Sequence, residues 1–285
     1  MIFTFSILHY KTLQDTIECI ESIKNLNYSC KIVVVDNGSN NGSFEKLKNI
    51  YRENDIVFID NDKNLGFAVA NNIGYKYAKE KLNSDFITVI NNDIIVKSKN
   101  IIEILINKWK KDSYYIAGPN IIGLDGVSHQ NPMDIIRYKK RQLLYKSFQH
   151  MVAFCLSKIG FYNLLNNYSE SQVSENNNWM DEKRNPQLQG SFIIYSPDYV
   201  NNEDFAFYPG TFLYMEEAIL RYYAISHNYL IMYYPEIEII HKGGVSTNAS
   251  YKNAKKIYEM RLKNISRSML VLRKVMKKYP MENYD

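Results

Sequence analysis

Short apolar runs alternate with longer amphipathic segments along the first third of the chain. The short runs have the length and β-branched content of buried strands, and they cover residues 2–8, 31–35, 56–59 and 86–90. The longer segments carry apolar residues at helical spacing and predict helices at residues 12–26, 43–51 and 66–82. Strands that alternate with helices pair in parallel through right-handed crossovers. We therefore predict an α/β fold in which helices flank a mostly parallel, Rossmann-like sheet.

The pattern of the remaining residues is less regular. Further helices are predicted at residues 101–109, 134–165 and 212–226, and further strands at residues 114–118, 189–195, 230–234 and 237–240. An Asp-Gly pair at 125–126 predicts a hairpin turn within residues 121–127. Residues 166–186 are polar and rich in Asn, which predicts a mobile loop.

Residues 251–279 predict a long, basic, amphipathic helix. Its apolar stripe alternates between spacings of four and three residues and consists of Tyr258, Leu262, Ile265, Met269, Leu272 and Met276. Lysine and arginine residues surround this stripe, with Glu259 as the one acid. Such a helix can lie on an anionic membrane surface, pack on the α/β domain, or pair with a second subunit in a homodimer. The sequence leaves these alternatives open.

Composition excludes several classes of protein. The formal net charge of +5 is modest and the basic residues concentrate near the C-terminus, so we expect no nucleic-acid partner. The three cysteines lack metal-ligand spacing, which excludes a zinc site and suits a reducing compartment. Residues 1–8 lack the basic lead and the cleavage site of a signal peptide, and no apolar run approaches the roughly 20 residues that span a bilayer. We expect a cytoplasmic protein, free or peripheral at the inner face of the cell membrane.

Polar side chains follow the second and the fourth predicted strands. Asp36 ends the run at 31–35, and Asn91, Asn92 and Asp93 end the run at 86–90. Ligands of open α/β sheets bind beyond the carboxyl ends of the strands, so Asp36 and Asp93 are expected at one edge. Asp93 alternatively caps a helix that begins near residue 98. The loop after the first strand reads HYKT and lacks Gly-x-Gly-x-x-Gly, which argues against an NAD or FAD enzyme.

Six separated segments resemble the family 2 glycosyltransferases, especially their bacterial rhamnosyltransferase-like branch. The segments are VVVDNGS at 33–39, NLGFAVANNIG at 64–74, NND at 91–93, FLYMEE at 212–217, YPE at 234–236 and HKGGVS at 241–246. They follow the family's order from residue 2 to about residue 247. The resemblance implies a GT-A fold with four parts: a nucleotide-sugar-binding half (1–128), a helical insertion with a flexible loop (129–188), an acceptor or catalytic half (189–250) and a C-terminal basic helix (251–285).

The resemblance also implies a nucleotide-diphosphate sugar as the donor, linked to UDP or dTDP, whose imide N–H would donate to Asp36. The donor-binding residues that it implies are His9, Tyr10, Asp36, Asn64, Gly66, Phe67, Asn71 and Asn92. Tyr10 would stack on the base, and Gly66 would allow a phosphate or ribose to approach the N-terminus of the helix at 66–82. Asn71 and its neighbour Asn72 either face the donor or only cap and pack. For Asp36, the alternative role is a turn in which its side chain binds the following backbone.

The implied metal ligands are Asp93 and His241, which would bind Mg²⁺ or Mn²⁺. Glu217 is the expected general base, and Glu216 is its alternative, because neighbouring helix residues point about 100° apart and should not both face the site. The family's Asp-x-Asp motif keeps only its last acid here, and its Glu-Asp-x-Asp-Leu segment lacks one acid.

These features together predict an inverting, metal-dependent glycosyltransferase of the hexosyl- or rhamnosyltransferase type. Its acceptor would be a saccharide or a lipid-linked saccharide in the synthesis of a surface polysaccharide or glycan. The missing acids motivate an alternative, a catalytically degenerate glycosyltransferase that serves as a binding subunit of a polysaccharide assembly complex. A sugar nucleotidyltransferase is disfavoured because it would need a glycine-rich, basic loop after the first strand.

Overall fold

One mixed sheet runs through the computed structural model, which describes residues 1–52, 55–162, 178–243 and 253–281. The strands are β1 (Phe3–His9), β2 (Lys31–Asp36), β3 (Ile56–Ile59), β4 (Phe86–Asn91), β5 (Ile94–Val96), β6 (Ile116–Gly123), β7 (Lys183–Arg184), β8 (Phe192–Tyr195) and β9 (Ile231–His241). Their order is β3-β2-β1-β4-β8-β6-β9-β5, and β7 pairs with β9. The helices are α1 (Leu13–Lys24), α2 (Ser43–Ile50), α3 (Phe67–Leu82), α4 (Ile101–Asp112), α5 (Lys140–Leu156), α7 (Pro197–Asn202), α8 (Glu216–Ser226) and α10 (Ala254–Lys278), and a π-helical turn, η1 (Ser157–Phe161), follows α5.

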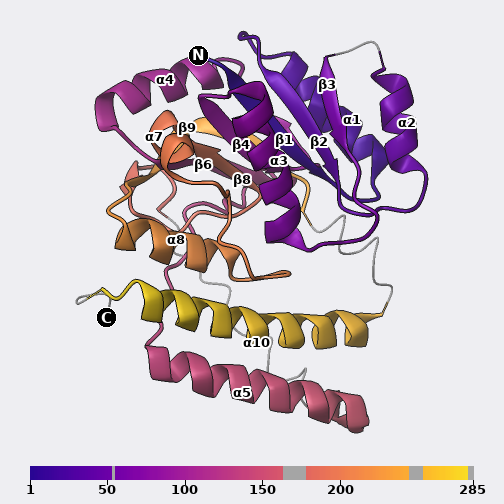
Figure 1. Cartoon of the computed structure of the whole chain (residues 1–285), viewed down its shortest axis with the longest axis vertical. Helices are drawn as coiled ribbons and strands as arrows, with labels where there is room; N and C mark the ends of the chain where they lie inside the picture. Colours follow the sequence, from indigo (N-terminus) through magenta and orange to yellow (C-terminus); the bar gives the residue numbers. More distant parts are fainter. Residues whose placement is uncertain (53–54, 163–177, 244–252, 282–285) are drawn as a thin grey trace.

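The first half of the sheet is parallel, as the sequence predicts. β1 lies between β2 and β4 and pairs in parallel with both. Residues of α1, α2 and α4 pack on one face of these strands, while α3 packs on the other (Figure 1). Strands covered on both faces are apolar throughout, which explains the unbroken runs in the sequence. Pairing places Asp36 beside His9 and Asn91 beside Leu8, so the carboxyl ends of β2 and β4 meet at one edge of the sheet.

The second half departs from simple alternation. β8 pairs antiparallel with both β4 and β6. The two strands expected at 230–234 and 237–240 are one strand, β9, whose pairing with β6 shifts register after Pro119. The short β5 and α7 were not predicted, because three- and six-residue elements carry too little periodicity. The Asp-Gly turn is present: the Gly126 N–H donates to the Gly123 carbonyl oxygen at 3.0 Å.

Two predicted helices begin later than expected. α5 begins at Lys140 rather than at residue 134. α8 begins at Glu216 rather than at residue 212, because Tyr214 and Met215 have φ angles of 75° and 68°, in the left-handed region that an α-helix excludes. Most of the loop expected at 166–186 lies outside the described residues. Its last part contains β7, so that part is paired in the sheet.

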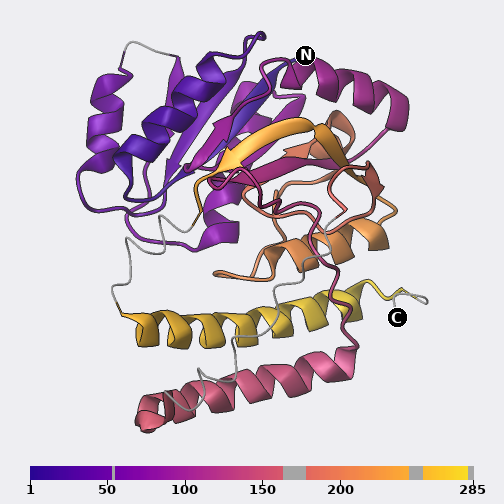
Figure 2. The same ribbon diagram turned by 180° about the vertical axis from the view of Figure 1, so that it is seen from behind.

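α10 lies between α8 and α5, and the three helices form a layer beside the sheet (Figures 1 and 2). The apolar stripe of α10 faces inward, where Met269, Leu272 and Met276 pack with Ile219 of α8 and Leu143 of α5. Packing on the domain is therefore the alternative that the structure supports for α10, and the stripe of α10 is not free to enter a membrane. Among the described helices, none combines the length and the apolar character needed to cross a bilayer.

Candidate functional site

The end of β2 carries Asp36, whose side chain is buried. One carboxylate oxygen accepts the Ser39 N–H at 3.0 Å, and the other accepts the Ser39 hydroxyl. Burial raises the pKa of Asp36, while the hydrogen bonds from Ser39 act in the opposite direction. The Asp36 carboxylate therefore binds the backbone that follows it, which is the turn expected as its alternative role. Because a carboxylate has about four acceptor positions, it retains capacity for a ligand N–H.

His9 and Tyr10 differ in their surroundings. The His9 ring is fully buried, with Nδ1 2.7 Å from the Thr16 hydroxyl and Nε2 2.8 Å from the Ser43 hydroxyl. Burial lowers the pKa of His9 to about 4, so the ring is neutral near pH 7. This geometry makes His9 a link between β1, α1 and α2 and leaves no ring face for a ligand. Tyr10 is partly exposed, as stacking on a base requires, and the Lys11 ammonium lies 4.9 Å from its ring centroid.

The loop before α3 is held by internal hydrogen bonds. The Leu65 N–H donates to the Asn37 amide oxygen at 2.9 Å, and the Gly66 N–H donates to the Asn64 amide oxygen at 2.9 Å. Within α3, the Asn71 amide donates to the Phe67 carbonyl oxygen at 3.0 Å. The side chains of Asn64 and Asn71 therefore shape this loop and the first turn of α3.

Gly66 is required for a reason that the sequence analysis did not find. Its φ is 87°, and a Cβ placed there would lie 2.5 Å from the Phe212 carbonyl oxygen. The same oxygen accepts the Phe67 N–H at 2.7 Å. The backbone of the segment before α8 therefore approaches Gly66 and accepts the neighbouring Phe67 N–H, and the role of Gly66 in admitting a phosphate or ribose stays a prediction.

Asn72 and Asn92 also bind protein groups. The Asn72 amide oxygen accepts the N–H groups of Ala206 and Phe207, each at 2.9 Å. The Asn92 amide donates to the hydroxyls of Thr12 at 2.8 Å and Thr16 at 2.9 Å. Asn92 thus links the end of β4 to the start of α1. These hydrogen bonds give Asn92 a structural role beside the predicted donor site.

The structure brings Asp93 and His241 together. Pairing of β5 with β9 places the His241 Nε2 3.3 Å from the Asp93 Oδ1, and both side chains are buried. The His241 Nδ1 lies 2.7 Å from the Gln130 side-chain amide, a contact that orients the imidazole ring. Asp93 does not cap α4, because the N-cap of α4 is Asn100. The alternative role of Asp93 as a helix cap is therefore excluded.

The contact between Asp93 and His241 leaves the buried Asp93 Oδ1 without a hydrogen bond from the described residues. A divalent cation bound by both atoms would satisfy this buried oxygen. Within the described ranges, no group of three or more His, Cys, Asp or Glu side chains is arranged to hold a metal. Any metal here would take its remaining ligands from water or substrate.

A cavity of about 480 Å³ lies at the N-terminus of α8. Its lining includes Phe67, Asn91 at the end of β4, Glu216 and Glu217, whereas Asp93 and His241 are not part of it. Both glutamates thus line one cavity, although neighbouring helix residues point about 100° apart. Side chains in the first turn of a helix lean toward its N-terminus, and the cavity lies over that end.

The two glutamates have different surroundings. Glu216 is only 3% exposed, and its Oε1 has no hydrogen-bond partner among the described residues. Glu217 is partly exposed, and its Oε1 accepts the Gly190 N–H at 3.3 Å. Burial raises the pKa of both carboxyls, and the charge of Glu217 raises that of Glu216 further. Because the Gly190 N–H favours a charged Glu217, Glu217 is the better candidate for a base and Glu216 for the protonated partner.

Several lining residues were missed by the sequence analysis. A Cβ at position 190 would lie 2.9 Å from the Glu217 Oε1, so Gly190 gives that carboxylate its room. Arg261 reaches the cavity from α10, far along the chain. Tyr214 and Met215 line it in left-handed backbone conformations that cost energy for residues with a Cβ. Gly190 carries a signal in the sequence, as a glycine inside the strand predicted at 189–195, and Tyr214 and Met215 lie in the FLYMEE segment at 212–217, whereas Arg261 carries none.

Comparisons with known proteins agree with the resemblance. The family model described as "Glycosyl transferase family 2" matches residues 6–167. A curated relative, the low-salt glycan biosynthesis hexosyltransferase Agl10 of Haloferax volcanii, is 32% identical over 126 residues, which are 42% of this chain and 37% of that protein. The match thus spans little more than a third of the relative's length.

Solved structures of S. aureus TarS residues 1–349 share the fold. The complex with UDP-GlcNAc aligns over 99% of this chain and 68% of that one, with a TM-score of 0.59 and 13% identity. The complex with UDP aligns over 93% and 65%, with a TM-score of 0.55 and 12% identity. At this identity the likeness is one of fold. Because the family model covers more than half of its residues, the chain belongs to glycosyl transferase family 2.

Proposed function

We propose that this chain is an inverting glycosyltransferase that transfers a hexose from a nucleotide-diphosphate sugar to a glycan acceptor. The observation that carries this proposal is the cavity in which Glu217, beside a buried Glu216, faces the carboxyl end of β4. The curated relative is named a hexosyltransferase in glycan biosynthesis, and the TarS structures hold UDP or UDP-GlcNAc. These names favour a hexose and a uridine donor over a dTDP-linked one.

Glu217 is the proposed general base. Its carboxylate would take the proton of the acceptor hydroxyl as that oxygen attacks the anomeric carbon from the face opposite the leaving group. The bond between the anomeric carbon and the phosphate oxygen breaks, the nucleoside diphosphate leaves, and the configuration inverts. The Gly190 N–H holds the carboxylate in position. Glu216, kept protonated by burial, adds no second charge to the cavity.

Asp93 and His241 are the proposed ligands of Mg²⁺ or Mn²⁺. The Asp93 Oδ1 and the His241 Nε2 lie 3.3 Å apart, so both atoms could bind one divalent cation whose remaining ligands would come from water or substrate. Gln130 would orient the imidazole through Nδ1, as partners outside the ligand shell commonly do. When bound, such an ion would neutralise the leaving diphosphate. Asp36 would accept the imide N–H of the uracil base.

Peripheral membrane contact is proposed through α5 instead of residues 251–279. α5 lies on the side of α10 away from the sheet (Figure 2). Its outer side exposes Leu144, Tyr145, Phe148, Met151 and Val152, with Phe148 66% exposed. α5 also carries Lys140, Arg141 and Lys146 and no acid. An exposed apolar stripe flanked by cations fits an anionic bilayer. Co-sedimentation with phosphatidylglycerol vesicles should fall for Phe148→Asp but not for Val127→Asp, which changes an exposed apolar residue outside α5.

The test of the transferase is release of UDP from UDP-hexoses in the presence of Mn²⁺. Glu217→Gln should lower kcat by about 10²- to 10⁴-fold, the range of general base catalysis. Glu103→Gln, an exposed acid in the first turn of α4, is the matched control and should have no effect. A wild-type protein that hydrolyses or transfers no nucleotide sugar but still binds a partner would favour the degenerate binding subunit. We also propose that the protein is cytoplasmic and that it forms a homodimer. Light scattering would test the homodimer.

A further inference from the structure

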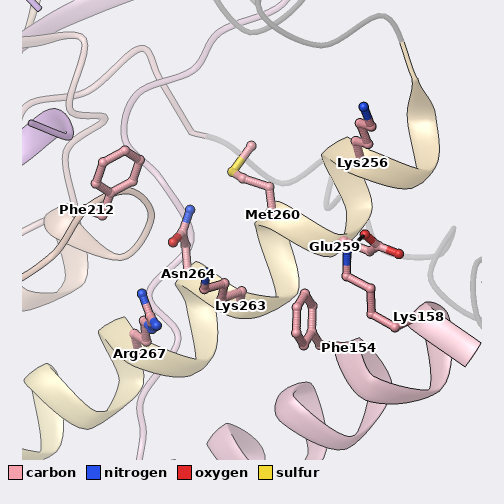
Figure 3. Close-up of a pocket in the computed structure, with 9 residues that line it drawn as sticks. All are labelled: Phe154, Lys158, Phe212, Lys256, Glu259, Met260, Lys263, Asn264 and Arg267. Carbon is pink, nitrogen blue, oxygen red and sulfur yellow. Dashed lines mark ion pairs between the residues drawn. The ribbon is translucent and has the colours of Figure 1, made fainter. Parts of the chain in front are cut away.

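A second cavity, of about 450 Å³, lies between α5, α10 and the segment before α8 (Figure 3). We infer that it binds the phosphate groups of a diphosphate-linked acceptor and so presents the acceptor sugar to the cavity that contains Glu217. The inference rests on the proposed function, because it names the substrate class that such a transferase would glycosylate. Its lining consists of Phe154, Lys158, Phe212, Lys256, Glu259, Met260, Lys263, Asn264 and Arg267.

The lining has a surplus of positive charge. Four of its side chains are cationic, and Glu259 is its one acid. The Glu259 carboxylate is already engaged, since it pairs with the Lys158 ammonium at 2.7 Å and accepts the Ser157 hydroxyl at 3.2 Å. Among the described residues, no acid pairs with Lys256, Lys263 or Arg267. Three cations around one cavity without acidic partners favour a polyvalent anion, and Arg and Lys are the usual ligands of phosphate.

Asn264 provides a second, independent observation. Its side chain is only 7% exposed and lines this cavity. Figure 3 shows this amide on the same side of α10 as Arg267, directed toward Phe212. A polar ligand atom at this place would use the hydrogen-bonding capacity of the amide, which has two N–H donors and one oxygen acceptor.

The remaining lining residues suit the lipid end of such an acceptor. Phe154, Phe212 and Met260 form apolar walls beside the cations. Phe154 belongs to α5, whose exposed apolar residues lie on the outer side of the molecule. A diphosphate held by the cations could thus extend its prenyl chain along apolar surface toward the membrane. An anion without an apolar group would leave these walls in contact with water.

The two cavities adjoin each other. Phe212 lines the cationic cavity, and the next residues, Leu213 to Met215, line the cavity of Glu217. On α10, Arg261 lines the latter and Asn264 the former, which is a rise of about 4.5 Å along the helix axis. The Ser268 hydroxyl donates to the Leu213 carbonyl oxygen at 3.4 Å and holds this segment on α10. A sugar attached to a bound diphosphate would therefore lie within reach of Glu217.

The experiment uses the full chain and geranyl diphosphate, titrated by calorimetry without divalent metal so that binding at the donor site is suppressed. Lys263→Gln/Arg267→Gln should weaken binding about 10-fold or more, because two charge-assisted contacts are lost. The matched control Lys274→Gln/Lys277→Gln removes two exposed cations of α10 outside the cavity and should bind as the wild type does. Asn264→Ala should also weaken binding, and unchanged Tm values would show that all variants fold.

Further titrations show which part of the ligand is recognised, and they test the phosphate site and the transferase separately. Geraniol should not bind, and inorganic pyrophosphate should bind more weakly than geranyl diphosphate. The inference is overturned if the wild type does not bind geranyl diphosphate, if the cavity and control variants bind it equally, or if the cavity variant loses only binding to phosphatidylglycerol vesicles. If the wild type binds geranyl diphosphate through Lys263 and Arg267 but releases no UDP from any UDP-hexose with Mn²⁺, the proposed transferase fails and the phosphate site stands.

Discussion

A methyl group added at Gly190 would touch the proposed base directly. In Gly190→Ala, the new Cβ would lie 2.9 Å from the Glu217 Oε1 and 3.5 Å from the nearest ring atom of Phe67. The contact with Phe67 is ordinary, whereas the carboxylate oxygen must move by about 0.5 Å to reach the 3.4 Å of a normal contact. Gly190 has no positive φ, so alanine adds no backbone strain.

Activity should therefore fall much more than stability. Since the atom that must move is the end of a flexible side chain, the free energy of unfolding should fall by about 1 kcal/mol. A displacement of about 1 Å can cost about 100-fold in rate, so half of that should lower kcat by about 10-fold. The movement also weakens the hydrogen bond from the Gly190 N–H, which holds the pKa of Glu217 down. The acidic limb of the pH–rate profile should therefore shift to higher pH.

The assay is UDP release with Mn²⁺ across a pH series, together with thermal unfolding. Gly126→Ala is the control, because Gly126 lies in a hairpin turn where a Cβ would meet no atom within 4 Å. Its φ of 70° predicts a loss of stability without a loss of kcat. If Gly190→Ala folds and keeps both the kcat and the acidic limb of the wild type, Glu217 is not the base.

Three further outcomes are expected. Asp93→Asn should abolish the rise in Tm that Mn²⁺ causes in the wild type while leaving the Tm without metal nearly unchanged; an unaltered metal response would remove Asp93 from the metal site. Because burial raises the pKa of Glu216 above 4.5, the folded protein binds an extra proton and loses stability as the pH rises above about 4.5. Glu216→Gln should remove this loss, so its Tm advantage over the wild type should grow between pH 5 and pH 8, and a constant difference would contradict the buried, protonated carboxyl. Gly66→Ala should lower the free energy of unfolding by about 2 kcal/mol or more in urea denaturation, since its Cβ would clash with the Phe212 backbone, and a neutral effect would show that this segment can move.

The amino-acid sequence by itself determined the first half of the fold. The runs that became β1 to β4 and the helices α1 to α3 were predicted almost to the residue, because each element is covered by its sequence neighbours. The family was recognised from short motifs such as residues 64–74, because each motif is contiguous in the sequence and the motifs occur in the family's order. Asp36 and Asp93 were expected at one edge because parallel strands carry their carboxyl ends to the same side.

Tertiary structure alone decided which groups these residues meet. The proximity of Asp93 to His241 depends on the register between β5 and β9, and Gly66 is needed for a contact with Phe212, far along the chain. The stripe of α10 was correctly predicted as apolar, yet only packing shows that α5 and α8 cover it and that the exposed apolar face belongs to α5. Periodicity reports that a face is buried, because burial acts on each side chain separately. Periodicity does not predict which segment covers that face, because the covering segment is distant in sequence.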